Sequence, residues 1–167
     1  HVFFKKVANK VRLMSDNSEL ILLGGSGNGK TEFYDELNSE LTSKCRFVDG
    51  LSFTTPVKDI HKIIIHHLYE YRKKHMEELM QKYEKLVKEG LTAKRNNVIN
   101  RALKIGSVET LIVSTLFHTK PQFKNILKML EEAKNTSCKI EFAMSPKIIK
   151  KLEIDDSVLA ILRYKIK

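Results

Sequence analysis

The chain reads ELILLGGSGNGKTEFY from Glu19 to Tyr34, an apolar run that enters a glycine-rich loop and leaves it as an amphipathic segment. Gly24 to Thr31 satisfies the phosphate-binding loop pattern G-x-x-x-x-G-K-[ST], in the strand–loop–helix context that this pattern requires. In such a loop, backbone N–H groups bind phosphates, the lysine neutralises their charge, and the threonine holds Mg²⁺. A nucleotide site here would use Gly24, Gly29, Lys30 and Thr31.

The same glycines also fit a purely structural strand-to-helix turn, because glycine lets the backbone reverse tightly and lets a helix pack closely. A nucleotide hydrolase would need, in addition, an acidic residue at the end of a second buried strand and a larger parallel sheet. Asp49, which follows Phe47-Val48, matches that acidic position poorly, because the charged Arg46 interrupts the apolar run before it. We therefore favour the structural turn and keep nucleotide binding as the alternative.

The composition indicates a globular protein without a membrane-spanning segment. The 167 residues, 42% apolar and 30% charged, could form one medium domain or two small ones. No run approaches the roughly 20 apolar residues that cross a bilayer, and no secretory leader opens the chain. Cys45 and Cys138 are too scattered for a zinc site or a disulfide framework, so we expect a reducing, cytoplasmic setting. Because the chain opens on His1, we expect a fragment of a longer protein.

The charge is strongly basic, with 30 Lys and Arg against 20 Asp and Glu and a net charge of +10. The excess lies after residue 50. Such a bias favours a polyanionic partner, with RNA or a ribosomal surface as the obvious candidate, although solvated helix faces would give the same count.

Hydrophobic periodicity predicts the elements of the first half. Residues 2–14 have the spacing of an amphipathic helix, Leu20–Leu23 and Cys45–Val48 read as strands, and Lys30–Leu41 reads as one helix between them. Thr55-Pro56 then begins a helix that meets no breaker before Gly90. Its expected buried stripe consists of Ile60, Ile64, Leu68, Tyr71, Leu79, Tyr83 and Leu86. A helix this long usually joins two packed bodies, so we place a domain junction near Gln81–Gly90.

The second half alternates between helices and strands. Helices are expected at 97–105, 121–133 and 145–152, and strands at 108–113, 139–144 and 158–166. This order predicts an α/β fold class: two small α/β domains joined through a long helix, the C-terminal one a two-layer or three-layer mixed sheet with helices.

Four phrases together resemble the superfamily of archaeal and eukaryotic class 1 peptide chain release factors and Pelota-type ribosome rescue factors. Arg101–Ser114 resembles the start of its third domain, and Leu159–Tyr164 resembles the "AILRY" strand that closes that domain. Phe3–Ala8 looks like the family's central-domain helix, and Leu22–Phe33 resembles its "GGPG..K.EF" turn. Residues 51–90 look closest to a divergent bacterial and archaeal branch.

The resemblance implies that residues 1–85 of this chain belong to the family's central domain and residues 86–167 to its C-terminal domain. It implies translation termination or ribosome rescue. The implied partners are the ribosome and ribosomal RNA, and a translational GTPase or a recycling ATPase, with no cofactor, metal or membrane. The family's hydrolytic Gly-Gly-Gln loop precedes the first helix and occurs nowhere in this chain. We therefore expect the chain by itself not to be an enzyme. A small nucleotide-binding protein and a non-catalytic RNA-binding module remain the alternatives.

Two further groups of side chains are candidate sites. Five outward lysines of the long helix are candidate contacts with ribosomal RNA: Lys73, Lys74, Lys82, Lys85 and Lys88. His61, His66, His67 and His75 crowd the same helix, but without the H-E-x-x-H spacing of a metal site we interpret them as packed or solvated.

Overall fold

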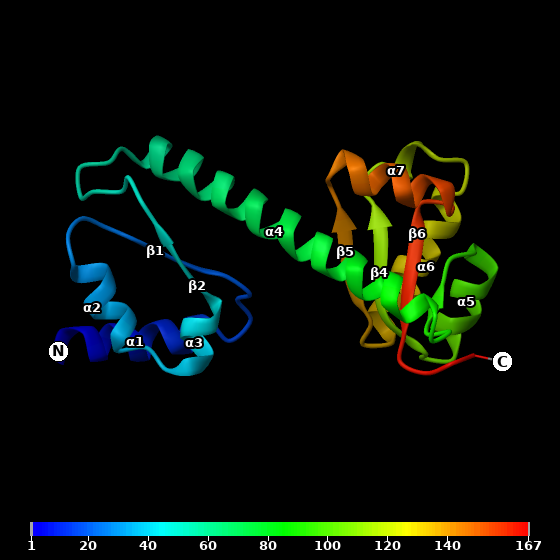
Figure 1. Cartoon of the computed structure of the whole chain (residues 1–167), viewed down its shortest axis with the longest axis horizontal. Coiled ribbons are helices and arrows are strands. Elements are labelled where there is room, and N and C mark those ends of the chain that lie inside the picture. Colours follow the sequence, from blue (N-terminus) through cyan, green and yellow to red (C-terminus); the bar gives the residue numbers. More distant parts are fainter. Residues whose placement is uncertain (1, 167) are drawn as a thin grey trace. The chain divides into compact units, whose positions relative to one another are not determined.

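The computed structural model describes residues 2–166, and these divide into two units, one ending at Glu70 and the other beginning at Tyr71. The long helix α4 (Val57–Val87) contributes to both (Figure 1). The sequence places the domain junction at residue 85, and the division between these two compact units falls at residues 70 and 71, inside α4. The reason is that the second half of α4 packs into the core of the second unit through Met76, Met80 and Tyr83.

The first unit is a small α/β layer around a two-stranded parallel sheet. Its elements besides α4 are α1 (Val2–Met14), β1 (Ile21–Gly24), α2 (Gly29–Asp35), α3 (Ser39–Lys44) and β2 (Cys45–Val48). Strand β1 pairs in parallel with β2, with Ile21 opposite Cys45. Ala8, Leu37, Leu41 and Cys45 form the buried centre of this unit.

The predicted single helix Lys30–Leu41 is wrong, because the chain forms two short helices there. Helix α2 ends at Asp35, and Asn38 caps α3 by accepting a hydrogen bond from the Leu41 N–H at 2.9 Å. Asparagine favours such caps because its side chain competes with the backbone for hydrogen bonds.

The second unit is a three-layer α/β sandwich. Its elements after α4 are β3 (Thr92–Ala93), α5 (Asn96–Lys104), β4 (Val108–Ser114), the 3₁₀ turn η1 (Phe117–Thr119), α6 (Phe123–Asn135), β5 (Lys139–Ala143), α7 (Pro146–Ile154) and β6 (Val158–Leu162). The strands lie in the order β3-β6-β4-β5, with β4 and β5 parallel and the other pairs antiparallel. The predicted mixed sheet is thus confirmed, although the two-residue strand β3 is too short to give a periodic signal and is missing from the prediction.

Two apolar cores lie on opposite faces of this sheet. Helices α5 and α6 cover one face with Ile99, Leu103, Ile126 and Met129, all fully buried. Helix α7 and the second half of α4 cover the other. A sheet covered on both faces explains why β6 is buried along its whole length.

The predicted buried stripe of α4 is only half right. Tyr83 is buried and Leu79 and Leu86 are partly buried, but Ile64 and Leu68 in the first half remain 38% exposed. The best-buried apolar positions of the helix include Met76 and Met80, which the predicted stripe omits. None of the described helices is long and apolar enough to cross a membrane.

Candidate functional site

The glycine-rich loop joins β1 to α2 and packs against the segment that follows β2. A Cβ atom at Gly24 would overlap the Leu51 side chain, so this position has no room for a larger residue while Leu51 stays in place. Gly27 has φ +69°, a conformation that favours glycine. Gly29, by contrast, lies in open space at the start of α2. Packing and backbone conformation therefore account for Gly24 and Gly27 but not for Gly29.

Lys30 lies in the first turn of α2 and forms an ion pair within the first unit. Its Nζ is 2.7 Å from Asp49 Oδ1 and 5.9 Å from the centre of the Phe47 ring. The hydrogen bond from Lys30, reinforced by its charge, lowers the pKa of the Asp49 carboxyl. Asp49 follows β2 directly, and because β2 runs parallel to β1 the two side chains meet at the same end of the sheet. Thr31 is exposed beside them.

The five lysines predicted to contact RNA are all exposed on α4 or just beyond its end, but they do not share one face. Lys82 Nζ lies 2.6 Å from Glu109 Oε1 of β4, and Lys74 Nζ lies 3.9 Å from Glu78 Oε1. At 3.6 residues per turn, Lys74, Lys85 and Lys88 fall within roughly 60° of one another, whereas Lys73 and Lys82 lie to either side. Lys85 and Lys88 have no ion pair within residues 2–166, so they are the members best placed to contact a polyanion.

The histidines of α4 do not assemble a metal site. His75 Nε2 lies 3.3 Å from Glu141 Oε1 of β5, and its ring stacks on Tyr71. In the part of the chain that the structure describes, no three His, Cys, Asp or Glu side chains lie close enough to hold a metal ion.

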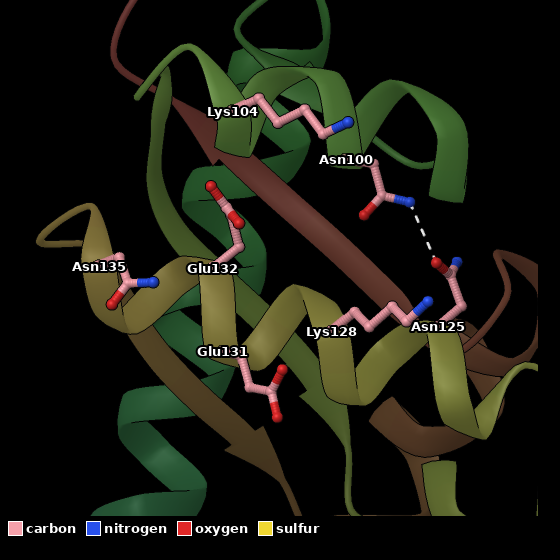
Figure 2. Close-up of a pocket in the computed structure, with 7 residues that line it drawn as sticks. All are labelled: Asn100, Lys104, Asn125, Lys128, Glu131, Glu132 and Asn135. Carbon is pink, nitrogen blue, oxygen red and sulfur yellow. Dashed lines mark hydrogen bonds between the residues drawn. The ribbon is translucent and has the colours of Figure 1, made fainter.

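The second unit carries a polar groove that sequence reasoning missed. It lies between α5 and α6, has a volume of about 420 Å³, and is lined by Asn100, Lys104, Asn125, Lys128, Glu131, Glu132 and Asn135 (Figure 2). Asn100 Nδ2 donates a hydrogen bond to Asn125 Oδ1 at 3.2 Å and links the two helices at one end. The lining residues come from two helices separated by a strand, so no local motif marks them.

The charged side chains of this groove are not neutralised by one another. Lys104 and Lys128 bring two cations, and Glu131 and Glu132 bring two anions. Across the described chain, no ion pair within 4.0 Å involves any of the four. The groove therefore presents both signs of charge to solvent.

Comparison with solved structures gives the fold of the whole chain. An archaeal Pelota in a model of ribosome-bound Pelota and ABCE1 superposes with a TM-score of 0.75 over 99% of this chain and 49% of that one, at 20% identity. Dom34 of S. cerevisiae, a translation termination-like factor interacting with Hbs1, superposes with a TM-score of 0.69 over 98% of this chain and 52% of that one, at 15% identity. Archaeoglobus fulgidus Pelota gives a TM-score of 0.54 over 99% and 54%, at 21% identity.

These matches establish a release-factor-like fold that runs through both units, and the predicted resemblance is confirmed at the level of fold. The chain spans about half the length of the structures that it matches. No protein-family model and no curated protein sequence matches it.

Proposed function

We propose that this chain is part of a translation termination or ribosome-rescue factor, comprising most of its central domain and all of its C-terminal domain. The observation that carries the proposal is the likeness to ribosome-bound archaeal Pelota over 99% of the chain, with a TM-score of 0.75. Such a factor would work in the cytoplasm, on the ribosome and its RNA.

The charge of the molecule supports a ribosomal partner. The net charge is +10, and Lys85 and Lys88 lie exposed in and just beyond the last turn of α4 without an ion pair in the described chain. Lysines that neutralise phosphates release counterions, so binding should weaken as salt rises. Lys82 should contribute less, since Glu109 already compensates its charge.

The partners named for the similar structures suggest the role of the second unit. The archaeal Pelota is ribosome-bound together with ABCE1, and Dom34 is described as interacting with Hbs1. By analogy, the C-terminal domain of this chain would dock a translational GTPase or a recycling ATPase. The chain alone would not hydrolyse peptidyl-tRNA, because no Gly-Gly-Gln sequence occurs in it.

The test is co-sedimentation of the chain with ribosomes over a series of salt concentrations. The wild type should bind at low salt. In the double variant Lys85→Ala/Lys88→Ala, the slope of log affinity against log salt concentration should be smaller in magnitude by about 2, because each lost phosphate contact lowers it by about 1. Lys134→Ala/Lys150→Ala removes two exposed lysines elsewhere in the second unit and should leave the slope unchanged. Absence of ribosome binding at low salt would refute the proposal.

A second candidate function is nucleotide binding at Gly24, Gly29, Lys30 and Thr31. The observation in its favour is that Asp49, at the end of the neighbouring parallel strand, reaches Lys30, which brings an acid to the place where a nucleotide hydrolase needs one. Against it, that pairing already neutralises the lysine, and the described sheet of this unit has two strands. We expect equilibrium dialysis with ATP or GTP and Mg²⁺ to detect no binding; micromolar affinity that disappears in Lys30→Ala would favour this candidate instead.

A further inference from the structure

We propose that the groove between α5 and α6 docks an extended peptide segment that carries both acidic and basic side chains. The groove lies wholly within the second unit, and this proposal does not depend on the ribosomal function. Its volume, about 420 Å³, falls in the range of clefts that bind ligands in proteins.

The two carboxylates of the groove differ from most others in the second unit, because they have no ion pair among the described residues. Most carboxylates of the second unit already have a partner: Glu84 pairs with Lys151, Glu109 with Lys82 and Glu153 with Lys120. Glu131 and Glu132 have neither an ion pair nor a side-chain hydrogen bond among the described residues. The groove thus gathers charges that the fold leaves uncompensated.

Neighbours on the same helix do not pair with these charges. Lys128 and Glu132 are four residues apart on α6, but lysine precedes glutamate, the less favourable order for a helical ion pair. Figure 2 shows the Lys128 side chain directed toward Asn125 and the Glu132 carboxylate directed toward α5. Both groups are therefore open to charges brought by a ligand.

The chemistry of the lining selects a polypeptide over other ligands. A nucleic acid or free phosphate would be repelled by Glu131 and Glu132, and a metal ion would be repelled by Lys104 and Lys128. The side-chain amides of Asn100, Asn125 and Asn135 offer both hydrogen-bond donors and acceptors. These amides match the N–H and C=O groups of an extended peptide backbone. A segment with a carboxylate near the lysines and a cation near the glutamates complements all of these groups.

The test uses three blocked hexapeptides as probes in two-dimensional amide NMR titrations of the full chain. The mixed probe is Glu-Ser-Lys-Glu-Ser-Lys, and the acidic and basic probes carry only Glu or only Lys at the charged positions. We expect shifts confined to α5 and α6, and at least fivefold tighter binding of the mixed probe than of either other probe. Shifts elsewhere, or equal binding of all three probes, would overturn the proposal.

Two variants keep the test specific. Lys104→Ala and Glu132→Ala should each weaken binding of the mixed probe at least threefold, whereas Lys150→Ala on α7 should leave it unchanged. Lys104 is exposed and Glu132 is partly exposed, and unshifted core resonances will verify that each variant folds. If an octauridine oligonucleotide shifts the same α5 and α6 resonances more strongly than the mixed peptide, the groove is a nucleic-acid site and the peptide proposal is wrong.

Discussion

Arg163 ties the end of β6 to the ends of two helices. Its Nη1 donates to the Gly106 carbonyl at 3.0 Å, just past α5, and its Nη2 donates to the Ser137 carbonyl at 3.0 Å, just past α6. Tyr164 Oη also donates to the Ile105 carbonyl at 2.7 Å. A cation at two helix C-termini satisfies carbonyls that no helical N–H reaches and complements both helix dipoles. The Leu162-Arg163-Tyr164 phrase therefore has a structural role.

The first prediction concerns this arginine. Arg163→Met should lower the free energy of unfolding of the second unit by about 1–2 kcal/mol, because charge-assisted hydrogen bonds to two carbonyls are lost. Arg163→Lys should recover part of the loss, since a lysine keeps the charge but cannot span both carbonyls. Urea denaturation followed by circular dichroism measures these differences. Lys150→Met, at an exposed position, is the control, and an equal loss there would remove the special role of Arg163.

The second prediction separates the glycines of the phosphate-binding pattern. Gly24→Ala should destabilise the first unit by about 1–3 kcal/mol, because the new methyl group overlaps Leu51. Leu51→Ala should relieve part of that cost in the double variant, a coupling that a double-mutant cycle measures. Gly29→Ala should be neutral or slightly stabilising, because Gly29 begins α2 in open space. Equal destabilisation by both glycine substitutions would contradict the assignment of Gly24 to packing.

At the level of elements, α4 has two halves in different environments. In the second half of α4, Met76 and Met80 pack against one face of the sheet of the second unit, where they share a core with Ile112 and Ile161. In the first half Ile64 is 38% exposed. The difference explains why one continuous helix contributes to two units.

The third prediction compares these halves. Met80→Ala should destabilise the second unit by about 2–4 kcal/mol, because it leaves a cavity in a close-packed core. Ile64→Ala, which removes a similar apolar side chain from the more exposed half, should cost less than about 1 kcal/mol. Chemical denaturation of both variants provides the comparison. Similar losses for the two would mean that the first half of α4 is as well packed as the second.

Some elements can be predicted from the sequence alone, and others depend on caps and tertiary contacts. Strands β2 and β4 and helix α1 follow from apolar periodicity, so the sequence predicts them closely, whereas β6 ends at Leu162, four residues before the predicted end at residue 166. The break between α2 and α3 depends on the side-chain cap at Asn38, and the methionines of α4 are buried only because the sheet lies against them. The groove likewise requires α5 and α6 to pack side by side, a tertiary contact that periodicity does not specify.

At the scale of the whole molecule, the two units differ in the quality of their cores. Leu111, Ile112 and Val113 of β4 are fully buried in the centre of a four-stranded sheet covered on both faces. In the first unit, Leu22 and Leu23 of β1 remain partly exposed in a two-stranded sheet. Buried strands with partners on both sides open only in global unfolding, whereas partly exposed edge strands open locally.

The fourth prediction follows from this contrast and is tested by hydrogen–deuterium exchange of the full chain, read out by mass spectrometry. Peptides covering β4 and β6 should exchange at least tenfold more slowly than those covering β1 and β2. Leu41→Ala, in the core of the first unit, should speed exchange throughout that unit by opening a cavity there, while β4 and β6 keep their protection. If protection of the second unit falls equally in this variant, the units unfold as one cooperative body rather than as two, and the stabilities of variants in either unit would report on the whole chain.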